Sequence, residues 1–556
     1  FPPERNAKLP GMTRQKNKTY LMENHCNALL VWHRLSITNA TLLHVDTHDD
    51  CRPIKKDRLT KLSALLEKRK YQKISKLSDN EWEDLFEAKP DDFLYDLGSF
   101  IYPALKLGMI TNFIWVIPDK TLTEKRVAEL YSHFANIFGP EISMVSTQTN
   151  KALFMLVGKP FAITTIDFIP PLLANTILDI DIDYFVFEQA LSSKHVKGNL
   201  PHDPQEVFNL LAEKIADPLC ITISSSVLGM YLPLQFRFLA DACFDFFSSE
   251  PKKYPDCAVN FLDYLSWIRT EGTVPPFPLR PPSEPPYLPA YRLLEGITLL
   301  MQGKDEEAIT ACEKAAVQLP VYRRGLIDFC DLLIKLGKPD QAAQSLGLYK
   351  EICGRPTTQG IAAEARLAIA QKRMSNALEL AEKLIEWDRQ PYFLMLYASI
   401  LCMMNRWEEA AAIYKETVDK SPNETIAIYN LAYANNVVGK KEDAIKWYKR
   451  VISVDTNFTA AYENLGHILL QNQRFDEAEE YLSEALKQNP DNPVTLNNLG
   501  LIFRQRGENE KAILIFQKAL AINPLLPAIH VNLISTLAAA GKNTEAAIAL
   551  QNAIKE

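Results

Sequence analysis

The sequence predicts an α/β domain with a mainly parallel sheet, followed by an all-α solenoid of paired helices. Apolar, strand-like runs alternate with amphipathic segments up to about residue 274, and a 34-residue period follows from residue 289. Between them, 8 of the 15 residues in 275–289 are proline, which favours an extended spacer that no helix can cross. We therefore expect domains at 12–274 and 289–556, joined by a linker at 275–288.

The composition excludes several classes of protein. The 556 residues are 47% hydrophobic and 23% charged, as in ordinary globular proteins, and the net charge of −7 argues against a nucleic-acid-binding surface. No run of about 18 apolar residues predicts a membrane span, and no signal segment is visible. The nine cysteines are odd in number and form no CxxC pair, which favours reduced thiols. We expect a cytoplasmic protein that binds neither nucleic acid nor membrane.

The first domain alternates strand and helix signals. Apolar runs at 41–45, 113–117 and 177–187 predict strands, whereas the amphipathic segments 57–69 and 124–138 predict helices. Such alternation favours a parallel sheet, in which binding sites form beyond the carboxyl ends of the strands. Chemistry is therefore expected where these strands end.

Acidic residues occupy the run that begins at residue 177. The sequence I-L-D-I-D-I-D-Y-F places Asp179, Asp181 and Asp183 on one face if the strand alternates regularly. Three carboxylates in so apolar a strand repel one another and lose hydration. A bound metal cation would supply the missing countercharge.

A second polar segment follows the strand predicted at 41–45. It carries Asp46, His48 and Asp50 at alternate positions, where the strand gives way to an exit loop. The combined set is rich in carboxylate and imidazole and lacks thiolate, which favours Mn²⁺ or Fe²⁺ over a structural zinc ion. The alternative is two exposed acidic loops or an isolated Ca²⁺ or Mg²⁺ site.

These motifs resemble those of the ureohydrolase superfamily of arginases and agmatinases. In that family an early His precedes D-x-H-x-D and a later D-x-D, and His25 in the sequence E-N-H fits the early element. The resemblance implies a three-layer arginase-like fold that holds two Mn²⁺ ions, with Fe²⁺ as the substitute. It implies that one ion is bound by His25, Asp46, Asp50 and Asp181, and the other by Asp46, His48, Asp181 and Asp183.

Other polar residues adjoin these ligands. The candidates for roles beside the metal are His44, Asp49, Asp179, Glu188 and His202. On a regular strand His44 faces the same way as Asp46, so it is either a catalytic group or a buried hydrogen-bond donor behind the ligands. A second frame, in which Asp179 and Asp181 are the D-x-D pair, stays open.

The resemblance is closest to an arginase-like branch that includes peptide arginases of ribosomal natural-product pathways. The segments G-S-F-I-Y-P-A at 98–104 and I-W-V-I-P at 114–118 support it. It implies a metal-dependent hydrolase that converts peptidyl arginine to ornithine and releases urea. The alternatives are another amidohydrolase or deacetylase on the same fold, and a non-catalytic scaffold with a structural metal site.

The second domain consists of eight units that resemble tetratricopeptide (TPR) repeats. Position 8 is small in seven units, and proline closes several of them, so that paired helices approach closely and then stop. The units start at residues 289, 323, 358, 391, 425, 459, 493 and 527. Position 20 is alanine in every unit: Ala308, Ala342, Ala377, Ala410, Ala444, Ala478, Ala512 and Ala546.

Position 6 of the last four units is asparagine. Equal positions of stacked repeats form a column, and a side-chain amide can pair with a peptide backbone of any sequence. The column resembles the asparagine ladder of O-linked N-acetylglucosamine transferase and implies that the repeats bind the precursor peptide. The alternative is that these amides only hydrate the groove or cap turns. They are Asn430, Asn464, Asn498 and Asn532.

Overall fold

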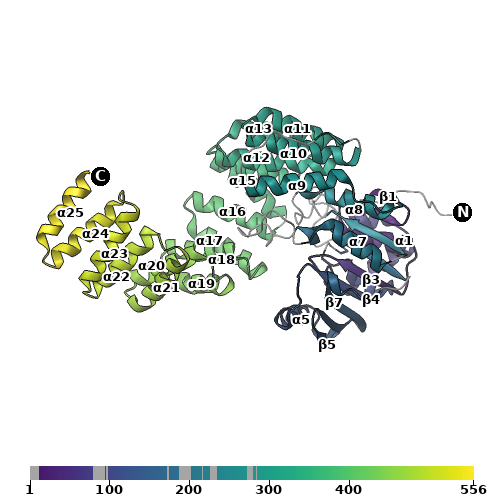
Figure 1. Cartoon of the computed structure of the whole chain (residues 1–556), viewed down its shortest axis with the longest axis horizontal. Coiled ribbons are helices and arrows are strands. Elements are labelled where there is room, and N and C mark those ends of the chain that lie inside the picture. Colours follow the sequence, from purple (N-terminus) through teal and green to yellow (C-terminus); the bar gives the residue numbers. More distant parts are fainter. Residues whose placement is uncertain are drawn as a thin grey trace. The chain divides into compact units, whose positions relative to one another are not determined.

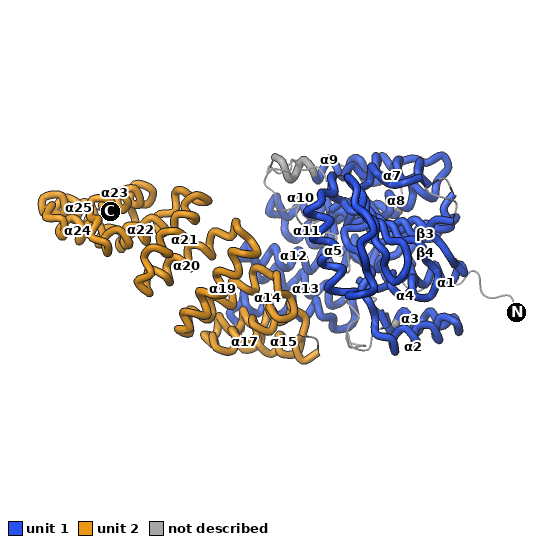
Figure 2. The backbone as a smooth tube through the Cα atoms, turned by 90° about the horizontal axis from the view of Figure 1, so that it is seen from below, with its two compact units in different colours: residues 1–372 blue, residues 373–556 orange. Residues whose placement is uncertain are grey.

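The computed structural model divides the chain into two compact units, residues 1–372 and 373–556 (Figure 2). Each is described here by itself. The residues that the structure describes are 12–78, 94–95, 98–171, 175–186, 202–215, 217–225, 234–271, 280–282, 285–387 and 389–555.

A nine-stranded mixed sheet forms the centre of the first unit. Its order is β1-β2-β9-β8-β3-β4-β7-β6-β5. The six strands from β2 to β7 in this order are parallel neighbours, whereas β1 at one edge and β6 and β5 at the other pair antiparallel. The strands are β1 Met12–Lys16, β2 Thr19–Met22, β3 Ala40–Val45, β4 Ile110–Ile117, β5 Ile142–Gln148, β6 Lys151–Leu156, β7 Lys159–Thr165, β8 Thr176–Asp181 and β9 Cys220–Ser224.

Helices cover both faces of the sheet (Figure 1). Alternate strand residues point to opposite faces, so Leu42 joins one core with α1, α4 and α5, while Leu43 joins another with α7 and α8. This arrangement confirms an α/β domain of three layers with a mainly parallel centre. The helices are α1 Ala28–Arg34, α2 Lys56–Glu67, α3 Tyr71–Lys76, α4 Ile101–Lys106, α5 Glu124–Phe138, α7 Pro204–Lys214, α8 Phe238–Ser248 and α9 Asp256–Glu271.

The order of the parallel strands contains a switch point. From β3 the chain continues to β4 and β7 on one side, and from β8 it continues to β9 on the other side. β3 and β8 are themselves neighbours, with His44 opposite Asp179. Ligand sites of parallel sheets form beyond the carboxyl ends of the strands at such a point.

One predicted strand is shorter than the sequence indicated. Asp179 and Asp181 lie on the same face of β8, as alternation predicted, but the strand ends at Asp181. The Asp181 side chain caps the following 3₁₀ helix, η5 Ile182–Phe185, by accepting from the Asp183 amide. The expectation that Asp183 shares this strand face was therefore wrong, because the backbone turns before it.

Sixteen helices, α10 to α25, follow in residues 285–555. Five of the predicted unit starts coincide with the first residue of a helix in the second unit, at Pro391, Thr425, Thr459, Pro493 and Pro527. The helices are α10 Leu288–Met301, α11 Asp305–Gln318, α12 Arg324–Lys335, α13 Pro339–Cys353, α14 Thr358–Ala370, α15 Met374–Trp387, α16 Pro391–Met403, α17 Trp407–Lys420, α18 Thr425–Val437, α19 Lys441–Val454, α20 Thr459–Gln471, α21 Phe475–Gln488, α22 Pro493–Gln505, α23 Asn509–Ile522, α24 Pro527–Ala539 and α25 Asn543–Lys555.

Small residues allow the paired helices to approach closely. A Cβ atom at Gly466 would lie 2.5 Å from the Leu482 side chain, and one at Gly500 would lie 2.5 Å from the Phe516 ring. The alanines at position 20 are buried in all eight units. The predicted reason for the repeat pattern is confirmed at these positions.

The compact units do not separate at the proline-rich segment. One core cluster continues from sheet residues such as Leu178 through α8 to Leu326 on α12 and Leu367 on α14. The first helices of the array therefore pack into the same unit as the sheet. The domain limits 12–274, 275–288 and 289–556 stay a prediction, since residues 272–279 and 283–284 of the predicted boundary lie outside the described part of the chain. Among the residues that the structure describes, no helix is long and apolar enough to span a membrane.

Candidate metal centre

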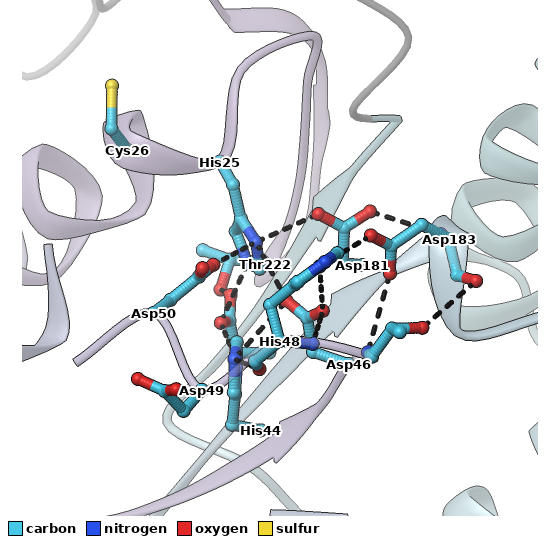
Figure 3. Close-up of polar contacts among 12 residues, drawn as sticks. His25, Cys26, His44, Asp46, His48, Asp49, Asp50, Asp181, Asp183 and Thr222 are labelled. Carbon is cyan, nitrogen blue, oxygen red and sulfur yellow. Dashed lines mark hydrogen bonds and ion pairs between the residues drawn. The ribbon is translucent and has the colours of Figure 1, made fainter. Parts of the chain in front are cut away.

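The predicted ligands converge at the carboxyl ends of the parallel strands β2, β8 and β3, of which β8 and β3 are neighbours (Figure 3). His25 begins the 3₁₀ helix η1 His25–Asn27 that follows β2 across a short turn. Asp46, His48 and Asp50 follow β3, while Asp181 ends β8 and Asp183 lies on η5. The sheet thus brings together side chains up to 158 residues apart in sequence, at the switch point between β3 and β8.

One group of ligand atoms surrounds the imidazole of His25. Its Nδ1 atom lies 3.3 Å from Asp46 Oδ2, 3.2 Å from Asp50 Oδ2 and 3.0 Å from Asp181 Oδ2. Its Nε2 atom donates to Asp179 Oδ2 over 2.8 Å. The carboxylate of Asp179 therefore orients the ring so that Nδ1 faces the acidic group, an arrangement typical of metal-binding histidines.

A second group gathers around His48. Its Nδ1 atom lies 3.0 Å from Asp183 Oδ2 and 3.6 Å from Asp46 Oδ1. Asp46, His48 and Asp183 have ligand atoms that all lie within 4.8 Å of one another, and the same holds for His25, His44 and Asp46. Asp46 belongs to both sets, as expected of a bridging carboxylate.

Asp179 lies behind the ligands rather than among them. Its Oδ2 atom accepts from His25 and from His44 Nδ1, each over 2.8 Å, and its Oδ1 atom accepts from the hydroxyl of Thr222. The Nε2 atom of His44 donates to the His48 carbonyl over 3.1 Å. This geometry favours the frame with Asp181 and Asp183, and it gives His44 and Asp179 the role of holding other residues.

The charges in this group conflict without a cation. Burial and the charge of Asp46 raise the pKa of Asp50 to about 7, and burial together with Asp181 raises the pKa of Asp183 well above its usual range. Burial would lower the pKa of His44, but Asp46 and Asp179 outweigh it and raise that pKa to about 10. Carboxyl and imidazole groups therefore hold protons that a metal ion would replace.

Two buried atoms test whether a metal ion fits. Neither Nδ1 of His25 nor Oδ2 of Asp46 has a hydrogen-bond partner among the described residues, although both side chains are about 1% exposed. Both atoms have charged neighbours at 3.0–3.3 Å, but none of these contacts has the geometry of a hydrogen bond. A cation between them accounts for both, and the oxygen and imidazole donors suit Mn²⁺ or Fe²⁺. The residues therefore fit a metal ion.

The remaining candidates lie at the edge or outside. Asp49 accepts from the Cys51 amide and lies 3.8 Å from Nε2 of His133 on α5, at the rim of the cluster. His202 donates to the Pro118 carbonyl over 2.8 Å and makes no contact with the cluster that the structure records. Glu188 lies outside the described residues.

Several residues at the site were not predicted as part of it. Thr222 on β9 donates to Asp179, Trp115 donates through Nε1 to the Asp46 carbonyl over 3.0 Å, and the Phe100 ring lies 4.7 Å from the ring of His25. Phe100 and Trp115 fall within the segments 98–104 and 114–118 that carried the family resemblance. Thr222 carried only the signal of a polar residue inside an apolar strand.

The predicted asparagine column lies on the first helix of each of the last four repeats. Asn430, Asn464, Asn498 and Asn532 are on α18, α20, α22 and α24, respectively. Neighbouring first helices exchange hydrogen bonds: Asn464 donates to the Tyr429 hydroxyl, and Asn532 donates to Asn497, each over 2.8 Å. Two of the four side-chain amides therefore use one N–H group in a hydrogen bond within the array.

Comparison with known proteins supports the repeats. Residues 457–524 match the family model described as tetratricopeptide repeat, and residues 290–461 match the one described as coatomer epsilon subunit. The C-terminal array thus contains tetratricopeptide repeats, a class of fold that binds peptides or proteins. Both matches lie outside the sheet, and no curated protein matches the chain.

Three solved structures that resemble part of this chain have low sequence identity to it. MamA of Desulfovibrio magneticus RS-1 is 20% identical, with 30% of this chain and 94% of that chain covered and a TM-score of 0.29. PilF of Pseudomonas aeruginosa is 17% identical over 39% and 96%, with a TM-score of 0.34. YrrB, described as a TPR protein with an unusual peptide-binding site, is 17% identical over 34% and 96%, with a TM-score of 0.28.

Proposed function

We propose that the chain is a two-metal hydrolase that converts arginine residues of a peptide to ornithine and releases urea. The observation that carries this proposal is the environment of His25, whose Nδ1 faces three carboxylates while Nε2 is held by a fourth. A lone structural cation does not need five buried carboxylates and a shared Asp46. The arrangement instead favours a pair of catalytic ions.

The family resemblance implies two overlapping ligand sets, which would share Asp46 and Asp181. Two divalent cations in these sets would lower the pKa of a shared water and so supply hydroxide near neutral pH. Asp179 keeps His25 oriented and stabilises the protonated form of His44. The backbone amides of His48 and Asp183 donate to Asp46 and Asp181 and so fix these two carboxylates.

The opening of the cluster suits a cationic substrate. The other ligands are buried, but the His48 side chain is 45% exposed, so the cluster meets solvent there. Asp49, beside His48, offers a carboxylate at the rim. A planar guanidinium pairs well with carboxylates in this position, because it donates two parallel hydrogen bonds.

The repeats would hold the peptide that carries this arginine. In the second unit, the first helix of each repeat carries few charges. Three of these helices, α16, α18 and α24, contain no Asp, Glu, Lys or Arg. Glu463 on α20 accepts from Asn492 and Thr495, and Arg504 on α22 donates to Ser535. Such a face offers amides and apolar side chains, which suit a peptide backbone better than charged side chains.

Mass spectrometry of peptides tests the proposed reaction. The full chain, loaded with Mn²⁺, is incubated with 15-residue peptides that contain one arginine, beside copies with lysine in its place. We expect the arginine peptides alone to lose CH₂N₂, with one urea released for each. Loss of acetyl groups from acetyl-lysine peptides instead would identify a deacetylase, and no reaction with any metal or peptide would contradict the proposal.

The amide column is tested by peptide binding. A peptide that the wild-type protein binds is the ligand. We expect Asn464→Ala combined with Asn498→Ala to raise the Kd for this peptide about tenfold, since each lost hydrogen bond to the peptide backbone is worth about 0.5–1.5 kcal/mol. Fluorescence anisotropy measures the Kd. Asn509→Ala, on a second helix, is the control. Equal affinities of all three proteins would remove the column from the binding site.

A further inference from the structure

A buried network of charged side chains lies behind the candidate metal centre, and the proposed reaction does not use it. Arg237, which precedes α8, is only 1% exposed. Its Nε and Nη2 atoms donate to the two oxygens of Glu23 over 3.0 and 2.6 Å, and Nη1 donates to Asp241 over 2.9 Å. Carboxylates therefore fix this guanidinium through the N–H groups along its edges.

Glu23 lies in the turn that delivers His25 to the site. Its Oε2 atom also accepts from the Ser225 hydroxyl over 2.5 Å, and the Ser225 amide donates to the Met22 carbonyl over 3.1 Å. Glu23 thus ties the ends of β2 and β9 to the start of α8. This side chain is attached to the backbone two residues before His25.

The network continues to the start of the helical array. Asp241 also accepts from Arg14 over 2.9 Å, and Arg14 donates to Asp245 over 2.5 Å. The hydroxyl of Tyr287, in the 3₁₀ helix η7 Pro285–Tyr287 before α10, donates to Asp245 over 2.7 Å. The chain of contacts therefore runs from the turn before His25 to the first repeat, within one compact unit.

Stability alone does not explain this network. Desolvation of buried charges costs as much as their attraction returns, so apolar residues of similar size are often equally stable. A fixed bidentate geometry is what such a pair provides and an apolar pair does not. The residue that benefits from it most directly is His25, whose Nδ1 must face three carboxylates.

We propose that Arg237 is a positioning residue of the metal centre, which fixes the turn that carries His25 through its bidentate contact with Glu23. The inference rests on the proposed function, because it requires that His25 binds a metal ion. It assigns Arg237 no contact with substrate. It also makes α8 and the network that leads to Tyr287 part of the support of the site.

Mn²⁺ affinity and stability of the full chain, measured together, test this role. The variants are Glu23→Gln, Arg237→Met and the two combined, with Mn²⁺ binding followed by the electron paramagnetic resonance of the free ion. We expect each single variant to lower Tm, because it leaves a buried charge partly unpaired. In the double variant Asp241 keeps Arg14 as its partner, so its Tm should be no lower than that of Arg237→Met alone. It should nevertheless bind Mn²⁺ about 10–100-fold more weakly than the wild-type protein, the usual effect of losing a residue that supports a ligand.

A second bidentate pair, which is partly exposed, provides the control. Arg366 on α14 binds Asp331 on α12 through Nε and Nη2, over 2.7 and 2.8 Å, in the same unit. Arg366→Met with Asp331→Asn should leave Mn²⁺ affinity unchanged. Wild-type affinity in the Glu23→Gln, Arg237→Met protein, or an equal loss in the control, would overturn the positioning role alone. No Mn²⁺ binding by the unaltered protein would overturn the proposed function and this inference together.

Discussion

At the scale of single residues, the candidate centre depends on which atom of each side chain points inward. Asp181 shows this clearly. Its Oδ1 atom caps η5 by accepting from the Asp183 amide over 3.2 Å, while Oδ2 faces His25 over 3.0 Å. One carboxylate thus caps the helix that follows β8 and also brings a negative charge to the cluster. A substitution can keep the first role and remove the second.

Asp181→Asn keeps the shape and removes the charge. The remaining side-chain oxygen still caps η5, so we expect a folded protein with unchanged peptide binding. Without the second charged oxygen, bound Mn²⁺ should fall from two ions per chain to at most one, and urea release should cease. Metal analysis after desalting and the urea assay measure both. Turnover at the wild-type rate would show that the ligand assignment is wrong.

The sequence predicts which residue types gather in the cluster, but not how each of them reaches it. The alternation of Asp179 and Asp181 holds because both are within β8, whereas Asp183 reaches the cluster only because the chain turns at Asp181. Thr222 and Arg237 act through contacts with residues 43 and 214 positions away, respectively, which no local pattern encodes. Local spacing predicts side chains that share a strand, and only the folded sheet determines their supports.

At the scale of elements, the repeats follow a simple packing rule. At Gly466 and Gly500, which occupy position 8 of their units, an added Cβ would collide with the second helix of the same repeat, so a small residue is favoured there. Unit starts were predictable because the rule recurs every 34 residues. The ends of the sheet strands were less predictable. One capping side chain, such as that of Asp181, can end a strand several residues earlier than the apolar pattern indicates.

Gly500 and Gly347 provide a matched test of this rule. Gly500→Ala should destabilise the C-terminal repeats by about 1–3 kcal/mol, because the new Cβ would meet the Phe516 ring. Gly347 lies within α13 with nothing near its missing Cβ, so Gly347→Ala should stabilise its helix by up to about 1 kcal/mol. Hydrogen exchange of α22 and α13 measures both. Equal effects would show that helix propensity, not packing, sets these positions.

At the scale of the whole molecule, the chain joins a sheet with an acidic centre to an array in which the helices α16, α18 and α24 contain no charged residue. Contacts group α10 to α14 with the sheet, although proline composition predicted a division before them, because Leu326 and Leu367 share the core of Leu178. A proline-rich segment shows where a helix cannot continue, but it does not determine into which hydrophobic core the next helix packs. Tethering a peptide near the acidic centre would raise the local concentration of its arginines.

Six side chains from three strand ends are proposed to hold two metal ions. Diffraction from crystals grown with Mn²⁺, recorded on both sides of the manganese absorption edge, tests it most directly. We expect two anomalous peaks, one among His25, Asp46, Asp50 and Asp181 and the other among Asp46, His48, Asp181 and Asp183. A single peak, or none at this site while Mn²⁺ binds elsewhere on the protein, would contradict the two-metal assignment.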